Sequence, residues 1–584
     1  MSAVLQFVGG LAFFLYGMSL LDKELKKLSG GKLEGALARM CSTPLRGVLL
    51  GAAVTAAIQS SSATTVMVVG FVNAGLMTLH GAVGVIIGAN LGTTVTAWIL
   101  SLSGISGGAP LLALLKPESL SPILMAVGTL LWMVAKKEKL HDLGAGLVGF
   151  GLLFAGMENM SGAVAPLASN PSFTKLLTLF QNPLAGLALG AILTAVIQSS
   201  SASIGILQAV SGTGTVNVGM TVPIVMGQNI GTCITALLSS VGAEKNARRA
   251  AFLHLYFNVA GAVILLGVFY ALRALGVVDA NVIVNEGSVA LIHTLFNVAA
   301  TAILLPMSRL LVKLVILSVP DRAVGASVQP SEKQEQLMLL DDRFLGSPAF
   351  ALNLSRASFC RYCEVVLDYF QTALGQYGAY SQQNEKRLDA YGALITRYEE
   401  KLGTYLVKLS STRLTETESA EVAVLLGAHA DVRRIGERGR DVVQSIAPPQ
   451  AGRPTETALR ELDVIRNAVA ELGNRTVRML RKRDLKAAHN VEALSGVLLG
   501  LCDTARRHHI ERLRGGQCSA ESASRFVAVI ADVESVADHC KRLAAIVVHR
   551  RQAIFDTQRS VRALREVDAA FDAAYRAFSL QYHL

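Results

Sequence analysis

The sequence predicts an all-α protein in two parts: a polytopic membrane half of two inverted repeats with re-entrant or interrupted helices, then a soluble helical bundle. Three observations lead to this fold class. The 584-residue chain is 52% hydrophobic, with a mean hydropathy of +0.44. Charge is unevenly divided, since residues 1–320 hold 17 Lys or Arg and 10 Asp or Glu, whereas the rest hold 37 and 33. Finally, a polar motif within the apolar half occurs twice at a fixed spacing.

The membrane half contains apolar runs that can cross a hydrocarbon core of roughly 30 Å at about 1.5 Å per helical residue. These runs are 4–21, 79–101, 121–135, 143–157, 247–272 and 287–317. The first is interpreted as a retained span with its N-terminus outside, because Lys residues follow it and none precede it. Two further stretches, 46–73 and 184–211, are apolar but broken by polar clusters. They predict re-entrant or interrupted helices.

An internal repeat is visible at an ungapped offset of 139 residues. TPLRGVLLGAAVTAAIQSSSA (43–63) aligns with NPLAGLALGAILTAVIQSSSA (182–202), and GANLGTTVTA (88–97) aligns with GQNIGTCITA (227–236). About 22 of the 54 positions from 44 to 97 are identical, far more than unrelated segments share. The membrane half is therefore predicted to be a duplication, with repeat 1 at about 4–135 and repeat 2 at about 143–317.

Basic residues indicate how the two repeats are oriented. The segment 22–46 carries six Lys or Arg, whereas its counterpart 161–185 carries only Lys175. Because basic loops stay in the cytoplasm, equivalent segments should face opposite sides of the membrane. If 46–73 re-enters, three membrane crossings separate the start of repeat 1 from the start of repeat 2. An odd number of crossings inverts the second copy relative to the first. The N-terminus is then periplasmic and the C-terminal half cytoplasmic.

Each repeat carries Q-S-S-S inside an apolar run, and G-x-N-[LI]-G-T about thirty residues later. Amide and hydroxyl groups at an interrupted helix, with the free N–H groups of a half-helix N-terminus, can hold an anion. The candidate anion ligands are Gln59, Ser60, Ser61, Ser62, Gln198, Ser199, Ser200 and Ser201. The alternative is that small polar residues merely let membrane helices pack closely. Repetition in two inverted copies favours a substrate site, because unpaired polar groups at the midplane are costly.

No Lys or Arg interrupts either polar cluster, so a bound anion needs charge from cations or helix dipoles. The candidate cation ligands are Asn90, Thr93, Asn229 and Thr232, in segments whose glycines should let the backbone turn and expose carbonyls. The alternative for these four residues is capping of broken helices. His80, His141, His254 and His293 are interpreted as packing or interfacial residues. The chain lacks G-x-x-x-x-G-K-[ST], so an ATPase is not expected, and the sequence is interpreted as that of a transporter and not of an enzyme.

The C-terminal half is predicted to follow a polar linker at 319–342 and to be helical. DVRRIGERGRD (431–441) and DVESVADHCKR (532–542) share a core, which suggests two three-helix units. Cys360 and Cys363 form a lone CxxC, for which a redox or zinc role is the minor interpretation. The net charge of +11 arises from mixed charges and membrane flanks, so no nucleic-acid partner is expected.

QSSSATT with GANLGTT, and QSSSAS with GQNIGT, resemble the signature of the type II sodium-dependent phosphate cotransporter family over residues 1–318. The resemblance implies symport of Na⁺ and inorganic phosphate across a bacterial inner membrane by alternating access around a midplane site between the QSSS motifs. Gln228 and Cys233 depart from the family's usual small residue and hydroxyl. A membrane phosphate sensor that signals through the C-terminal half is the alternative, and a channel is a third.

Residues 343–584 resemble a PhoU-type domain, which implies regulation of transport and acidic positions that could hold a divalent or iron cation. Those positions are Asp431, Glu437, Asp441, Asp532 and Asp538. The alternative is that these carboxylates are solvated or pair with Arg433, Arg434 and Arg438. The implied partners are phosphate and the lipid bilayer. A homodimer and phosphate-regulatory proteins remain open.

Overall fold

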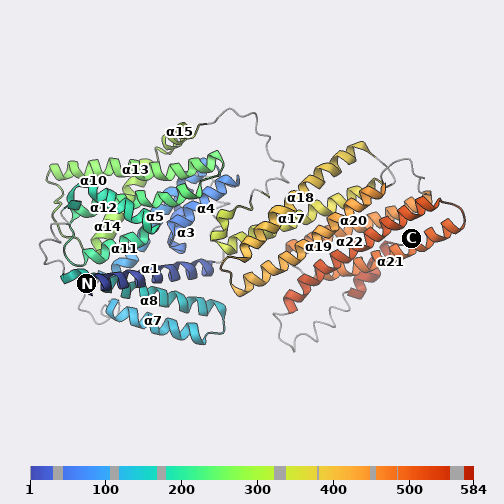
Figure 1. Cartoon of the computed structure of the whole chain (residues 1–584), viewed down its shortest axis with the longest axis horizontal. Helices are drawn as coiled ribbons and strands as arrows, with labels where there is room; N and C mark the ends of the chain where they lie inside the picture. Colours follow the sequence, from blue (N-terminus) through green and yellow to red (C-terminus); the bar gives the residue numbers. More distant parts are fainter. Residues whose placement is uncertain are drawn as a thin grey trace. The chain divides into compact units, whose positions relative to one another are not determined.

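The computed structural model describes residues 2–29, 44–104, 117–166, 179–320, 337, 339–377, 381–446, 455–482, 485–552 and 571–584. Packing divides the chain into two units (Figure 1). The membrane unit comprises Met1–Val328 with Arg343–Phe350, and the C-terminal unit comprises Gln329–Asp342 with Ala351–Leu584. Much of 22–46 and 161–185, including Lys175, and most of the 319–342 linker lie outside the described residues.

Among the described residues, six helices are long and apolar enough to cross a membrane. They are α1 (Ser2–Ser29), α5 (Leu79–Ser101), α8 (Glu138–Val164), α12 (Val218–Ser239), α13 (Lys245–Ala274) and α14 (Glu286–Leu304). Large apolar side chains on their outer faces are exposed, such as Val4 and Tyr16 on α1 and Val263 on α13. Such an exposed apolar surface is what contact with lipid requires.

The predicted spans are largely correct, with three differences. The run 121–135 lies on α7 (Pro117–Val134), whose apolar part, Ser119–Val134, is shorter than the six candidate spans. The run 287–317 divides into α14 and α15 (Ser308–Ser318). The third difference is α12, which was not predicted as a span because Pro223, Gln228 and Asn229 interrupt its apolar sequence.

Equivalent helices in the two repeats begin at matching positions. The pairs are α3 (Pro44–Ile58) with α10 (Pro183–Ile197), α4 (Ser61–Asn73) with α11 (Ser200–Ser211), and α5 with α12. The predicted interruptions are confirmed, since both 15-residue helices stop just before a Gln and the next helix begins two residues after that Gln. Local capping explains the other starts: Thr78 accepts from Gly81 N at 3.1 Å and Asn217 accepts from Met220 N at 3.0 Å.

The expected sharp turns at the two G-x-N-[LI]-G-T motifs are wrong, because α5 and α12 run through them without a break. Their glycines instead let helices touch. A Cβ at Gly88 would lie 2.1 Å from the carbonyl oxygen of Val48 on α3, and one at Gly227 would lie 2.0 Å from that of Leu187 on α10. Glycine serves both purposes, and here the neighbouring helix occupies the space that a side chain would need.

A second layer of the membrane unit consists of α1, α8 and α7, which lie side by side in Figure 1. Glycines again mediate the contact, since a Cβ at Gly17 on α1 would lie 2.6 Å from the carbonyl oxygen of Gly149 on α8. Phe14 of α1 is fully buried and approaches Gly205 of α11. This layer therefore packs against α11, the helix that follows the break in repeat 2.

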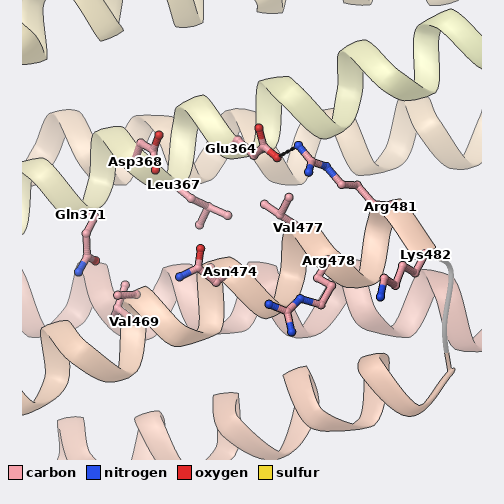
Figure 2. Close-up of a pocket in the computed structure, with 12 residues that line it drawn as sticks. Glu364, Leu367, Asp368, Gln371, Val469, Asn474, Val477, Arg478, Arg481 and Lys482 are labelled. Carbon is pink, nitrogen blue, oxygen red and sulfur yellow. Dashed lines mark hydrogen bonds and ion pairs between the residues drawn. The ribbon is translucent and has the colours of Figure 1, made fainter. Parts of the chain in front are cut away.

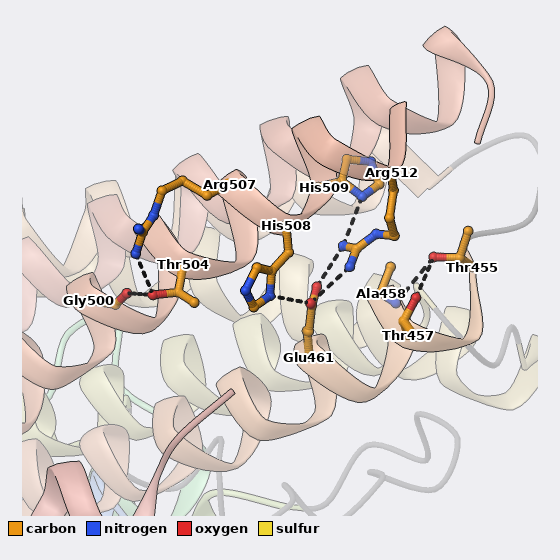
Figure 3. A network of polar contacts seen from close by, with 10 residues as sticks. All are labelled: Thr455, Thr457, Ala458, Glu461, Gly500, Thr504, Arg507, His508, His509 and Arg512. Carbon is orange, nitrogen blue, oxygen red and sulfur yellow. Dashed lines mark hydrogen bonds and ion pairs between the residues drawn. The ribbon is translucent and has the colours of Figure 1, made fainter. Parts of the chain in front are cut away.

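Six long helices lie in the described part of the C-terminal unit, and the first of them begins just before the unit's boundary at Ala351. They are α17 (Pro348–Gly375), α18 (Gln382–Ser410), α19 (Glu416–Ile446), α20 (Glu456–Lys482), α21 (Leu485–Arg514) and α22 (Ala520–Gln552). The two related motifs lie on α19 and α22, the third helix of each consecutive set of three, and these two helices pack together. Figure 3 shows the beginning of α20 beside the end of α21, where Arg512 donates two hydrogen bonds to Glu461 at 2.9 and 2.6 Å. His508 lies 2.9 Å from the same carboxylate.

Candidate functional site

The two helix breaks share an unusual backbone conformation at their glutamines. Gln59 has a φ of 59° and Gln198 a φ of 58°, and they are the two non-glycine residues with positive φ in the described part of the chain. The left-handed conformation costs about 1–2 kcal/mol for a residue with a Cβ. A strain that occurs at the same position of both repeats indicates that each break needs a Gln side chain where Gly would be easier.

Serines then cap the half-helices that follow. Ser60 Oγ accepts from Ala63 N at 3.2 Å, and Ser199 Oγ accepts from Ala202 N at 3.2 Å. Ser61 and Ser200, the first residues of α4 and α11, are buried. The backbone N–H groups of such a first turn have no partner within the helix and carry partial positive charge. Each break thus combines an amide, three hydroxyls and a helix N-terminus, which together suit an anion.

The surroundings of the two glutamines differ. Gln59 is buried, and its Oε1 accepts from Thr96 Oγ1 of α5 at 2.8 Å. Beside it, Thr55 Oγ1 donates to Thr64 Oγ1 at 3.0 Å. In repeat 2 Gln198 is exposed. The hydroxyls of Thr194 and Ser203, which correspond to Thr55 and Thr64, are buried without a partner. The repeats therefore share a backbone but not a set of contacts.

Helix α5 connects the first break with the half-helix of the second repeat. Thr96, which holds Gln59, immediately precedes Ala97, whose carbonyl oxygen accepts from Gln208 Nε2 of α11 at 2.9 Å. One turn further, the side chain of Leu100 lies 3.3 Å from the position of a Cβ at Gly205 on α11. The polar break of repeat 1 and the interrupted helix of repeat 2 thus contact the same segment of α5.

The four predicted cation ligands are buried in the middle of α5 and α12, so the capping alternative is wrong for them. Thr93 and Thr232 donate to carbonyl oxygens of their own helices, at 3.1 and 2.9 Å. Asn229 Nδ2 donates to Val225 O at 3.1 Å. Asn90 is different, because Nδ2 donates to Asn258 Oδ1 of α13 at 2.7 Å and Oδ1 lies 3.1 Å from His254 Nε2.

His254 and His293 are not interfacial residues, since both are fully buried inside the membrane unit. The interpretation as packing residues also missed that His254 contacts a candidate cation ligand. The sequence contains a pattern that could have indicated a shared role for the two histidines, because an Asn follows each of them four residues later. In a helix, residues four apart lie on one face.

The proposed metal position in the C-terminal unit is not supported. In the described ranges no group of three or more His, Cys, Asp or Glu could hold a metal ion. The predicted carboxylates pair with cations instead. Asp431 contacts His539 at 2.9 Å and Arg542 at 3.7 Å, Glu437 contacts Arg433 at 3.7 Å, Asp441 and Asp532 contact Arg438 at 2.8 and 3.3 Å, and Asp538 contacts Arg542 at 3.6 Å. The alternative of ion pairing is therefore the one observed.

Cys360 and Cys363 lie in the core of the C-terminal unit, on α17. Burial raises the pKa of the Cys363 thiol well above its ordinary value, and the neighbouring Cys540 and Cys360 add to the rise. A thiol that stays protonated is a poor nucleophile and a poor metal ligand. The CxxC therefore fits packing, as the sequence interpretation preferred.

Asp532 should make the C-terminal unit depend on pH. Burial raises the pKa of its carboxyl to about 6, the hydrogen bond from Arg438 opposes this and Asp441 adds to it. The folded state then holds this proton more tightly than the unfolded state, so Asp532 lowers stability as pH rises from about 4 to 6. We expect Asp532→Asn to reduce this loss, measured as hydrogen exchange of α19 and α22 in the full chain between pH 4 and pH 7. Equal pH profiles for both proteins would contradict the prediction.

The C-terminal unit also contains a pocket of about 720 Å³ between α17 and α20 (Figure 2). Its α20 side presents Asn474, Arg478, Arg481 and Lys482, and its α17 side presents Glu364, Asp368 and Gln371. Glu364 pairs with Arg481 across the pocket. Side chains of both charges thus line the pocket, and the positive ones are concentrated toward the C-terminal end of α20.

Comparison with known proteins identifies the membrane unit. A family model described as Na+/Pi-cotransporter matches twice, at residues 13–162 and 155–282. YqeW of Bacillus subtilis (strain 168), described as uncharacterized, is 30% identical over 321 residues, which cover 55% of this chain and 99% of that protein. YjbB of Escherichia coli (strain K12), named for inorganic phosphate export, is 27% identical over 267 residues, 46% of this chain and 47% of that protein.

A shorter match of 98 residues, 38% identical, relates 16% of this chain to 14% of the human sodium-dependent phosphate transport protein 2B. The chain thus spans nearly all of YqeW but about half of YjbB. No solved structure matches the chain significantly. With the apolar helices, these matches show a multi-pass membrane protein. The chain belongs to the Na+/Pi-cotransporter family.

Proposed function

We propose that this protein is a sodium-coupled secondary transporter of inorganic phosphate that works by alternating access around a site between its two Q-S-S-S breaks. The observation that carries the proposal is the matched pair of breaks, with a left-handed Gln at 59 and 198 and a capping Ser at 60 and 199. Phosphate transport in the named relatives and the family match support the substrate. The proposed phosphate ligands are Gln59–Ser62 and Gln198–Ser201.

The ligands around the proposed anion are neutral, which makes cation coupling a physical need. Amides, hydroxyls and helix N-termini supply partial charges only, whereas phosphate carries one to two full negative charges. A co-bound Na⁺ near Asn90 and Asn229 would offset that charge, because amide and hydroxyl oxygens are ligands that hard cations prefer. These side chains are buried on α5 and α12, next to the interrupted helices of their own repeats.

We infer an inverted topology from charge. Basic residues at 136–139, 245–249 and at Arg309 and Lys313 then fall in the cytoplasm of a bacterial cell, and the N-terminus falls outside. Residues 1–318 form the transport domain in this proposal, and 343–584 form a cytoplasmic, PhoU-like regulatory domain. The offset of 139 between the starts of α3, α4 and α5 and those of α10, α11 and α12 supports the duplication.

Uphill flux is the decisive test. The purified chain in liposomes should accumulate labelled phosphate above the external concentration when an inward sodium gradient is imposed. Neither a potassium gradient nor a proton gradient should replace sodium, and excess sulfate should not compete. Equilibration without accumulation would indicate a channel and would overturn coupled transport.

A phosphate sensor is the second candidate, and the cationic side of the pocket at Arg478, Arg481 and Lys482 is the observation that favours it. Deleting residues 351–584 separates the two functions. Residues 343–350 should be kept, because Phe344 packs on Phe71 with ring centroids 5.3 Å apart and Arg343 Nε donates to Ser239 O at 2.8 Å. A transporter should still accumulate phosphate after this deletion. A full chain that binds phosphate but moves none would support the sensor.

A further inference from the structure

Helices α13 and α14 carry a second internal similarity within the membrane unit. LHLYFNVA (253–260) on α13 and IHTLFNVA (292–299) on α14 share His, Phe, Asn, Val and Ala in the same positions. The two helices also occupy related places, since each packs against both α5 and α12. The equivalent residues are His254 with His293, and Asn258 with Asn297.

The two His-Asn pairs have the same internal geometry. Asn258 Nδ2 donates to His254 O at 3.0 Å, and Asn297 Nδ2 donates to His293 O at 2.9 Å. All four side chains are fully buried. In each pair the amide oxygen and the imidazole can contact a neighbouring helix, and Asn258 Nδ2 also donates to Cys233 Sγ of α12 at 3.3 Å.

The two pairs differ in their hydrogen bonds to neighbouring helices. On α13 both groups hold the amide of Asn90: Asn258 Oδ1 accepts from its Nδ2 at 2.7 Å, and His254 Nε2 lies 3.1 Å from its Oδ1. Because that oxygen can only accept, Nε2 of His254 carries the proton. On α14 both imidazole nitrogens of His293 and Oδ1 of Asn297 are buried without a hydrogen-bond partner. Buried polar groups normally have partners, so an imidazole with neither nitrogen bonded, beside an unbonded amide oxygen, is unusual; in the pair on α13 only Nδ1 of His254 lacks a partner.

Asn229 of α12 is the counterpart of Asn90 at the repeat offset, and here its Nδ2 bonds only within its own helix, to Val225 O. Its helix already contacts α14: Met226 and Phe296 belong to one buried cluster, and Ile230 packs against that cluster. Ile230 is adjacent to Asn229, and Phe296 is adjacent to Asn297. Asn229 and the unpartnered pair His293–Asn297 thus lie on helices that touch.

We infer that His254–Asn258 and His293–Asn297 are two positioning pairs, which hold the amides of Asn90 and Asn229 in turn as the protein changes conformation. The structure shows the state in which the first pair is engaged and the second is open. In the opposite state His293 and Asn297 would hold Asn229, and Asn90 would be released. This inference rests on the proposed sodium-coupled transport, in which the two asparagines are cation ligands.

The transport test uses the sodium concentration that gives half-maximal phosphate uptake. His293→Leu should raise it about tenfold, the effect of losing one buried hydrogen bond, and His293→Gln should restore it because an amide N–H replaces the imidazole donor. Adding His293→Leu to Asn229→Ala should have no further effect, whereas adding it to Asn90→Ala should. For His254→Leu we expect no further effect when it is added to Asn90→Ala, and a further effect when it is added to Asn229→Ala. Equal additivity in all four combinations would overturn the assignment.

A second test does not depend on transport. In a chain whose native cysteines are replaced by serine, the pair Asn90→Cys with Asn258→Cys should form a disulfide on oxidation, because the two asparagine side chains are hydrogen-bonded at 2.7 Å. The pair Asn229→Cys with Asn297→Cys should also form one, and sodium should change the ratio of the two rates. Absence of the second disulfide under every ion condition would overturn alternation. If the wild type shows no sodium-driven uptake while both disulfides form, the proposed function fails and the paired contacts stand.

Discussion

Replacing Gln59 by glycine should abolish most phosphate transport while leaving the membrane unit about as stable, because relief of backbone strain offsets the lost hydrogen bond with Thr96. Gly adopts the left-handed conformation freely, so the change removes about 1–2 kcal/mol of backbone strain. It also removes the amide that Thr96 holds at the break. Hydrogen bonds to a charged group contribute about 1.5–3 kcal/mol, so uptake at low phosphate should fall about 10–150-fold. The measurements are sodium-driven uptake in liposomes and thermal unfolding in detergent.

Three matched variants identify the cause. Gln59→Asn keeps an amide and tolerates a positive φ, so it should retain part of the activity. Gln59→Ala keeps the strain and lacks the amide, so its uptake should fall as much as that of Gln59→Gly and it should be less stable than Gln59→Gly. Ser200→Ala should lower transport from the other repeat without preventing insertion. Normal uptake by Gln59→Gly would show that the break needs the backbone shape alone, and the proposed role of the side chain would be wrong.

Local chemistry explains which features of the site the sequence could predict. The two breaks were predictable because Gln-Ser-Ser-Ser recurs in register, and a Ser that caps a helix acts on a backbone N–H only three residues away. The matching starts of α3, α4 and α5 with α10, α11 and α12 follow from the same sequence identity. In the C-terminal unit, helical periodicity predicted helices, and the related motifs, which suggested two three-helix units, occur on α19 and α22.

Tertiary contacts explain what could not be predicted. The glycines at 88 and 227 suit both a sharp turn and a close helix contact, and only the position of α3 and α10 decides between them. The two partners of Asn90 on α13 are 164 and 168 residues away in the chain, so no local pattern assigns them. Likewise, Asp532 resembles a metal ligand until Arg438 from another helix is found beside it.

Alanine at Gly227 should prevent the membrane unit from folding correctly. A Cβ there would lie 2.0 Å from the carbonyl oxygen of Leu187 and 2.8 Å from its carbonyl carbon, and both atoms belong to the backbone of α10. Neither can turn away as a flexible side chain would, so α10 and α12 would have to separate along their glycine contact. Overpacking a tight core costs about 1–3 kcal/mol, and a clash with backbone should reach or exceed the upper end. Gly88→Ala should behave alike, because its Cβ would lie 2.1 Å from the carbonyl oxygen of Val48.

Gly267 supplies the matched control. It lies inside α13 of the same unit, and a Cβ at that position would meet nothing within 4 Å. Alanine there should stabilise the helix by up to about 1 kcal/mol, because Gly is the weaker helix former. The fraction of protein that remains monodisperse after heating in detergent should therefore fall for Gly88→Ala and Gly227→Ala and stay level or rise for Gly267→Ala. If all three variants behaved alike, the close contacts of α3 with α5 and of α10 with α12 would not be what holds the two repeats in shape, and the interrupted helices would need another support.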